Sequence, residues 1–117
     1  IVVLNNLIIN AIESIVERHE RDNSITDKKL MITTASVGDG VSVEVLDNGV
    51  GFNDEQRNNL FRFGFTTKAS GNGFGLHSCA DIIKLLGGYI QADSEGVNRG
   101  AVFRISLPTE IKSHDIQ

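Results

Sequence analysis

The spacing of the apolar residues changes along this chain, and the change restricts the fold more than any other feature of the sequence. Near the beginning, apolar residues recur at helical spacing and predict a helix of about four to five turns. The buried stripe of this helix is expected to consist of Leu4, Leu7, Ile8, Ala11, Ile12 and Ile15. Residues 30–37 and 41–47 are instead rich in β-branched residues, which favour strands. Because Gly38-Asp39-Gly40 separates them, the two segments predict an antiparallel hairpin.

Two further helices are predicted after the hairpin. Asn53 and Gln56 have the spacing of a capping box and open a short helix that runs to about Leu60. A longer helix begins after Gly75 and ends at Gly87-Gly88, since glycine commonly follows the last helical residue. The apolar face of this longer helix is expected to consist of Leu76, Cys79, Ala80, Ile83 and Leu86.

The chain closes with two predicted strands, at residues 89–95 and 101–108, and Pro108 stops the second. The full order is helix, hairpin, short helix, loop, helix and two strands. This order predicts a two-layer α/β sandwich, a mixed sheet with helices on one face. A doubly wound fold is excluded because its strands and helices would alternate throughout. Residues 1–108 are expected to form one domain and residues 109–117 a tail.

Composition restricts the class of protein. With 117 residues, 40% of them hydrophobic, the chain suits a single domain. A net charge of -4 gives no basic surface for nucleic acid. The one cysteine, Cys79, and the lack of a spanning apolar run or signal peptide indicate a cytoplasmic location. The sequence begins inside a helical pattern without a cap, so we expect it to be a fragment of a longer protein.

The stretch Gly71-Asn72-Gly73-Phe74-Gly75-Leu76 directly precedes the longer helix. Backbone N–H groups here, together with the positive end of the helix dipole, suit a phosphate, and a mobile linker is the alternative. The stretch is not a P-loop, because Leu76-His77 follows where lysine and serine or threonine would stand. A long loop rather than a strand precedes it, which excludes a dinucleotide fingerprint. Lys68, with Thr66 and Thr67 beside it, is a candidate partner for the same phosphate.

Asp47 ends the second strand of the hairpin on the same face as Val45. A carboxylate on a dry face is costly unless donors satisfy it, so Asp47 either caps its own turn or accepts from a ligand amino group. An adenine amino group would suit it, whereas guanine presents a carbonyl oxygen at that position. Gly49 and Gly51 would then leave room for a flat ring against the backbone.

Asn10 lies beside the apolar stripe of the first helix. Taken alone, it is a polar residue at a helix edge. Above a triphosphate, its amide oxygen would suit Mg²⁺, which prefers oxygen ligands and keeps several waters and phosphate oxygens.

In this order, these segments resemble the catalytic and ATP-binding domain (HATPase_c) of sensor histidine kinases, within the gyrase, chaperone, kinase and mismatch-repair (GHKL) superfamily. The resemblance covers residues 1 to about 108. It is carried by an N box at 6–11, a G1 box at 47–51, an F box at 60–68, a G2 box at 71–76 and a closing glycine and strand at 100–103.

The resemblance implies a Bergerat fold in which ATP lies between the first helix and a lid at about residues 61–72. It implies that Asn10 binds Mg²⁺, that Asp47 accepts from the adenine amino group and that Lys68 stabilises phosphate. No catalytic residue is assigned in the chain, because the acceptor histidine would lie elsewhere. The implied nucleotide-binding residues are Asn6, Asn10, Asp47, Gly49, Gly51, Thr67, Lys68, Gly71, Gly73, Phe74, Gly75 and Leu76.

One position indicates transfer rather than hydrolysis. The hydrolysing branches of the superfamily carry a glutamate one turn before the metal asparagine, where this chain has Asn6, and an amide is no general base. The implied partners are an upstream dimerisation and histidine phosphoacceptor domain and the receiver domain of a response regulator. The fragment would be monomeric, and its parent homodimeric and either cytoplasmic or anchored in the inner membrane. The alternatives are an anti-sigma-factor-type protein-serine kinase and an ATP-binding regulatory module without transfer.

Overall fold

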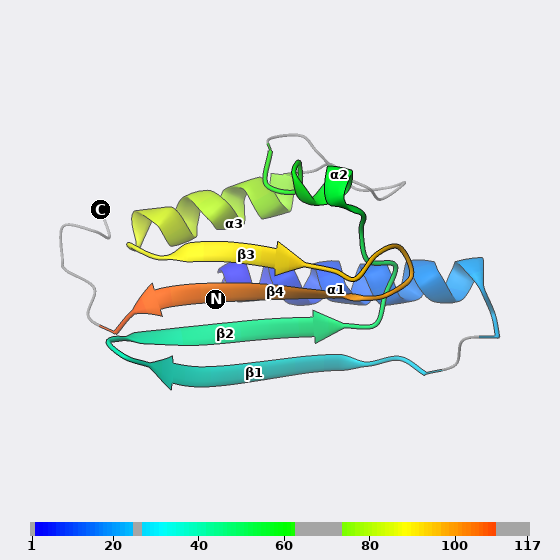
Figure 1. Ribbon diagram of the computed structural model, residues 1–117, viewed down its shortest axis with the longest axis horizontal. Coiled ribbons are helices and arrows are strands. Elements are labelled where there is room, and N and C mark those ends of the chain that lie inside the picture. The colour runs from blue at the N-terminus through cyan, green and yellow to red at the C-terminus, as the bar shows by residue number, and fades with distance from the viewer. Residues whose placement is uncertain (1, 25–26, 63–73, 110–117) are drawn as a thin grey trace.

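The computed structural model describes residues 2–24, 27–62 and 74–109 and has the predicted order of elements. They form a two-layer α/β sandwich, in which α1 runs behind the sheet and α3 lies beside β3 (Figure 1). The elements are α1 (Val2–Arg21), β1 (Leu30–Val37), β2 (Gly40–Asp47), α2 (Asp54–Arg57), α3 (Phe74–Leu85), β3 (Tyr89–Asp93) and β4 (Ala101–Pro108). The predicted two-layer sandwich is therefore confirmed.

The sheet has the strand order β1-β2-β4-β3, and its three pairings are all antiparallel. The expected mixed sheet is therefore wrong for the described strands. The reason lies in the position of β4. Strands β2 and β3 run in the same direction, because each is antiparallel to β4. The helical segment that connects them therefore has the form of a crossover between parallel strands. Since β4 lies between them, β2 and β3 form no parallel pair.

The core lies between the sheet and the two longer helices. On β4, alternate residues Ala101, Phe103 and Ile105 are buried, as the predicted period of two requires. In the register of β2 with β4, Val45 lies opposite Phe103 and Asp47 lies opposite Ala101. This register brings the carboxylate to the end of the buried face.

The buried stripe of α1 differs in part from the predicted one. It consists of Val3, Leu7, Ala11 and Ile15, each four residues after the last. Ile12 is 47% exposed, so its predicted place in the core is wrong. A strict spacing of four residues gives a narrow stripe centred on Leu7 and Ala11, and Ile12 lies too far round the helix to reach the sheet.

The start of α2 and the end of α3 agree with the prediction, whereas α2 is shorter than predicted. The capping box at α2 is confirmed: Gln56 N–H donates to Asn53 Oδ1 at 2.8 Å, and Asn53 N–H donates to Gln56 Oε1 at 2.9 Å. The helix stops at Arg57, short of the predicted Leu60, and Leu60 itself is buried in the core. At the end of α3, Gly88 N–H donates to the Ile83 carbonyl at 2.9 Å, the six-residue bond of a Schellman motif.

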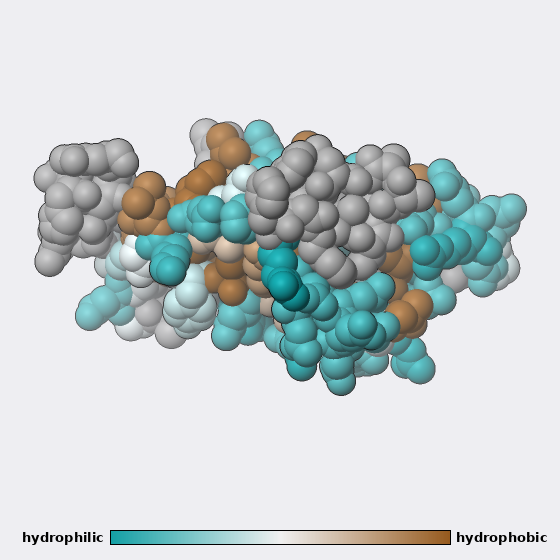
Figure 2. All heavy atoms as spheres, turned by 90° about the horizontal axis from the view of Figure 1, so that it is seen from above, coloured by the Kyte–Doolittle hydropathy of each residue, from teal (hydrophilic) through white to brown (hydrophobic). Residues whose placement is uncertain are grey.

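The surface on the side of α2 and α3 shows hydrophobic residues scattered among hydrophilic ones (Figure 2). None of the helices in the described ranges is long and apolar enough to cross a lipid bilayer.

Candidate functional site

Asp47 ends β2 and, at 4% exposure, is the one polar or charged side chain of the described residues that is buried. The predicted inward phase of this residue is therefore confirmed. Its Oδ1 accepts a hydrogen bond of 2.8 Å from Gly49 N–H. A carboxylate accepts several hydrogen bonds, so Asp47 holds its own turn and can also accept from a ligand amino group.

The turn after Asp47 packs directly against α1. Val50 N–H donates to Ser14 Oγ at 3.0 Å. A Cβ atom on Gly49 would lie 2.6 Å from the Ser14 carbonyl carbon and 2.8 Å from Ile15 N, closer than real Cβ atoms approach. The first glycine of the turn is therefore required by the contact between the turn and α1.

The second glycine of the turn is required by the loop between β3 and β4. Gly51 has φ 62°, and a Cβ there would lie 2.6 Å from Ser94 Oγ and 2.6 Å from the Gly100 carbonyl oxygen. The protein itself fills the Cβ position of both glycines, so internal packing accounts for them. That they also leave room for a flat ring against the backbone stays a prediction.

Asn48 ties the same turn to the chain that precedes β1. Its Oδ1 accepts from Lys29 N–H at 2.8 Å, and its Nδ2 donates to the Asp27 carbonyl at 2.8 Å. The Asn48 carbonyl accepts from Arg18 Nη1 of α1 at 2.7 Å. The residues beside Asp47 are thus held from α1, from the segment before β1 and from the β3–β4 loop.

Helix α1 links this turn to α3. Asn6, Asn10 and Ser14 follow one another at four-residue spacing, about 6 Å apart along the axis, and all three are half-buried. At one end, Cys79 of α3 contacts α1: burial raises the pKa of its thiol, and a hydrogen bond with the Asn6 side chain acts in the opposite direction. At the other end, Ser14 contacts Val50. Asn10 lies between the two contacts.

The start of α3 has a different environment. Gly75 is exposed, and a Cβ there would meet no atom within 4 Å in the part of the chain that the structure describes. Leu76 is half-buried and packs against the core, and no acidic side chain lies in the first turn. The helix begins at Phe74, two residues earlier than predicted, and the side chain of Phe74 lies outside the described part of the chain. Free backbone N–H groups and the positive dipole end make such a terminus suitable for an anion.

Four predicted site residues lie outside the described ranges: Thr67, Lys68, Gly71 and Gly73. Most of the expected lid, at about residues 61–72, lies outside them too. Phe61, at its start, is described: its carbonyl oxygen lies 3.1 Å from His77 Nδ1, and its ring contacts Phe103 edge to face.

The described residues offer few oxygen ligands for a metal ion. They suit a magnesium ion that is bound mainly by nucleotide phosphates better than one that is bound by the protein alone. No group of three or more His, Cys, Asp or Glu side chains gathers in the described ranges. Asn10 offers one neutral oxygen, and Mg²⁺ is commonly held by one or two protein oxygens together with substrate phosphates and water.

Sequence reasoning missed two residues that hold the site, Ser14 and Ser94. Ser14 could have been found, because it continues the spacing from Asn6 and Asn10 by one turn. For Ser94 the local sequence contains no comparable pattern, since its contact with Phe52 joins residues 42 positions apart.

The chain is similar to known proteins in both sequence and structure. The family described as histidine kinase-, DNA gyrase B-, and HSP90-like ATPase matches residues 1–111. The sensor protein FixL of Bradyrhizobium diazoefficiens is 40% identical over 106 residues, which are 91% of this chain and 20% of FixL. The sensor histidine kinase ZraS of Escherichia coli strain K12 is 36% identical over 116 residues, 98% of this chain and 23% of ZraS. The chain thus spans about a fifth of the length of these relatives.

Two solved structures share the fold. The catalytic domain of the histidine kinase ThkA, in a nucleotide-free form, has a TM-score of 0.72 and 33% identity. The match covers 92% of this chain and 64% of that one. The mycobacterial sensor histidine kinase MprB has a TM-score of 0.77 at 17% identity, over 95% of this chain and 70% of that one, and supports the fold alone.

Proposed function

Because the chain belongs to the family of histidine kinase-, DNA gyrase B- and HSP90-like ATPases, as its motifs predicted, we propose that it is the ATP-binding catalytic domain of a sensor histidine kinase. The observation that carries the proposal is the buried carboxylate of Asp47 at the end of β2. A buried carboxylate is costly unless hydrogen-bond donors satisfy it, and the amino group of a nucleotide base supplies such a donor.

Base recognition is assigned to Asp47. Its Oδ1 is fixed by Gly49 N–H at 2.8 Å, so the carboxylate has a defined orientation. It accepts from the adenine amino group and repels the carbonyl oxygen that guanine presents. A hydrogen bond to a charged group contributes about 1.5 to 3 kcal/mol, which corresponds to about one to two decades of affinity.

Magnesium and the phosphates are assigned to α1 and to the start of α3. Asn10 supplies a side-chain oxygen to Mg²⁺, which neutralises phosphate charge when bound. Asn6 lies one turn away, at the contact with α3. The backbone at Gly75 and Leu76 faces the phosphates, and the absence of a close contact at Gly75 among the described residues supports this assignment. We extend the same assignment to Phe74 and to four residues outside the described ranges, Thr67, Lys68, Gly71 and Gly73.

The reaction that we propose is transfer of the γ-phosphoryl group to a histidine on a separate dimerisation domain. Asn6 stands where a general base for hydrolysis would stand, and an amide does not take up a proton at neutral pH. Catalysis then depends on positioning and on charge neutralisation. The relatives named above are sensor proteins, which favours histidine over serine as the acceptor.

The partners follow from the same proposal. The parent protein is a homodimer that carries the phosphoacceptor domain, and a response regulator accepts the phosphoryl group from it. The single cysteine is buried and unpaired, which suits a reducing compartment, so we place the domain in the cytoplasm.

Calorimetric titration of the chain with ATP, ADP and GTP, each with and without Mg²⁺, tests the proposal. We expect ATP to bind more tightly than GTP and Mg²⁺ to strengthen ATP binding. A chain that gives neither heat nor a thermal shift with any adenine nucleotide at saturating Mg²⁺ contradicts the proposal.

A further inference from the structure

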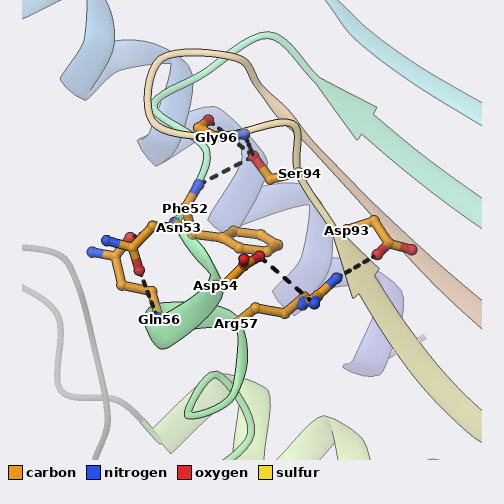
Figure 3. A network of polar contacts seen from close by, with 8 residues as sticks. All are labelled: Phe52, Asn53, Asp54, Gln56, Arg57, Asp93, Ser94 and Gly96. Atoms are coloured by element: carbon orange, nitrogen blue, oxygen red, sulfur yellow. Dashed lines mark hydrogen bonds and ion pairs between the residues drawn. The ribbon is translucent and has the colours of Figure 1, made fainter.

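The hydroxyl group of Ser94, at the start of the β3–β4 loop, contacts three residues, and its contacts with Phe52 and Gly96 are shown in Figure 3. Ser94 Oγ lies 3.2 Å from Phe52 N and 3.1 Å from Gly96 N, and both N–H groups donate to it. It also lies 2.6 Å from the Gly100 carbonyl oxygen and 3.0 Å from the Gly96 carbonyl oxygen. A hydroxyl has one proton and two lone pairs, so the shorter contact, to Gly100, is the one it donates to.

These contacts reach both ends of the turn that follows Asp47. On one side, Ser94 holds Phe52 N–H, and Phe52 is buried at 5% exposure. On the other side, it holds the carbonyl of Gly100, whose own N–H donates to the Gly49 carbonyl at 3.1 Å. Gly100 also lies against the backbone of Asp47, because a Cβ there would overlap the Asp47 carbonyl oxygen and lie 3.0 Å from Asn48 Cα.

The position of Asp47 therefore depends on Ser94 through one intermediate residue. Gly100 precedes Ala101, which pairs with Asp47 in the sheet. A displaced Gly100 carbonyl shifts the backbone that supports the Asp47 carboxylate. A hydrogen bond weakens steeply as its donor–hydrogen–acceptor angle falls. A small shift of the Asp47 carboxylate would therefore weaken its hydrogen bond with an adenine amino group, which approaches from a fixed direction.

We propose that Ser94 is a positioning residue for base recognition: its hydroxyl fixes Gly100 and Phe52, and these hold the Asp47 carboxylate in the orientation that accepts an adenine amino group. The inference rests on the proposed function, since it names the support of the same base site. Ser94 itself contacts no nucleotide in this proposal.

The test compares the Ser94→Ala chain with the natural one in calorimetric titrations with ATP and with GTP at saturating Mg²⁺. We expect the affinity for ATP to fall about tenfold, and the ratio of ATP to GTP affinity to fall with it. A variant that is merely less stable loses apparent affinity for both nucleotides by the same factor, so its ratio stays unchanged. Ser94→Thr keeps the hydroxyl and is expected to keep the ratio.

The chain offers a matched control at the far end of the sheet. Thr109 Oγ1 donates to the Asp39 carbonyl at 2.7 Å, so Thr109→Val also deletes one hydroxyl that holds a backbone carbonyl. We expect this variant to bind ATP and GTP as the natural chain does.

Two results overturn the inference while the proposed function stands. One is a natural ATP to GTP ratio in Ser94→Ala. The other, measured without nucleotide, is unchanged hydrogen exchange at the Phe52 and Gly100 amides of Ser94→Ala, which we expect to become faster. If the natural chain binds no adenine nucleotide, the proposed function and the role of Ser94 in base recognition both fail. The exchange experiment then still reports whether the hydroxyl holds the turn.

Discussion

The turn that follows Asp47 and the start of α3 both contain glycine, and the two regions use it differently. At Gly49 and Gly51 the space of a side chain is filled by Ser14, Ser94 and neighbouring backbone. At Gly75 a Cβ would meet no atom of the described residues within 4 Å. Internal packing thus requires the first two glycines, whereas no contact within the described ranges requires Gly75. A glycine with no internal reason is the better candidate for close approach by a ligand.

The difference between the two regions also predicts which changes affect the stability of the fold and which affect ligand binding. The turn after Asp47 is held from three directions, so its geometry exists before any ligand arrives and its disruption lowers the stability of the fold. At the start of α3, Gly75 is exposed while Leu76 packs against the core, so a change at Gly75 affects ligand binding with little effect on folding. The predictions below test this separation, beginning with the largest effect.

Gly51→Ala should lower the free energy of unfolding by about 2 to 4 kcal/mol, because the added methyl overlaps Ser94 and Gly100 and φ at this position is 62°. Urea denaturation measures the change. Gly75→Ala is the matched control and should leave stability unchanged or raise it by up to about 1 kcal/mol, since alanine favours helix. Equal stability of the two variants would contradict the distinction between packed and open glycines.

Asp47→Asn should reduce the preference for ATP over GTP by about ten- to a hundredfold, because the amide no longer offers a charged acceptor to the base. Calorimetry with both nucleotides measures the ratio. Glu44→Gln is the control on the same strand, where Glu44 Oε1 accepts from Arg104 Nη2 at 2.9 Å on the opposite face of the sheet. Intact discrimination in Asp47→Asn would remove the base assignment.

Asn10→Ala should weaken ATP binding about tenfold in the presence of Mg²⁺ and little in its absence, because one oxygen ligand is lost. This variant tests whether α1 contributes a metal ligand between the turn that follows Asp47 and the start of α3. Asn5→Ala, at an exposed position of the same helix, serves as the control. Asn10 has no role in metal binding if the variant keeps the full effect of Mg²⁺ on affinity.

Gly75→Ala should weaken ATP binding a few-fold while adenosine binding stays unchanged, because only the phosphates approach this backbone. Isothermal titration with both compounds measures the two affinities. A parallel loss for adenosine would show that the start of α3 does not act on phosphate alone.

Local patterns in the sequence predicted much of this structure. The helix and strand periods, the capping box at Asn53 and the glycine end of α3 depend on neighbours within a few residues. All agree with the observed elements except at Ile12, which was placed in the core and is exposed. The burial of Asp47 followed from the same kind of pattern, because a period of two fixes the face on which it lies.

Contacts between distant segments were the part that could not be predicted. The insertion of β4 between β2 and β3 depends on pairing across the whole domain, and no local pattern specifies it. The internal packing that requires glycine at positions 49 and 51 was not predicted, because it also depends on distant segments. Ser14 contacts Val50, 36 positions away in the sequence, and Ser94 contacts Phe52, 42 positions away. The local sequence of this turn therefore suggests flexibility, whereas the structure shows that it is packed.

The supports of Asp47 also have an order in time. The carboxylate and its turn are synthesised well before Ser94 and Gly100, which come from the last loop of the described chain. A nascent chain that has only reached α3 holds the acid without the groups that orient it. We therefore expect nucleotide to assist folding only after the final hairpin has left the ribosome, and truncation before β3 to abolish base selectivity altogether.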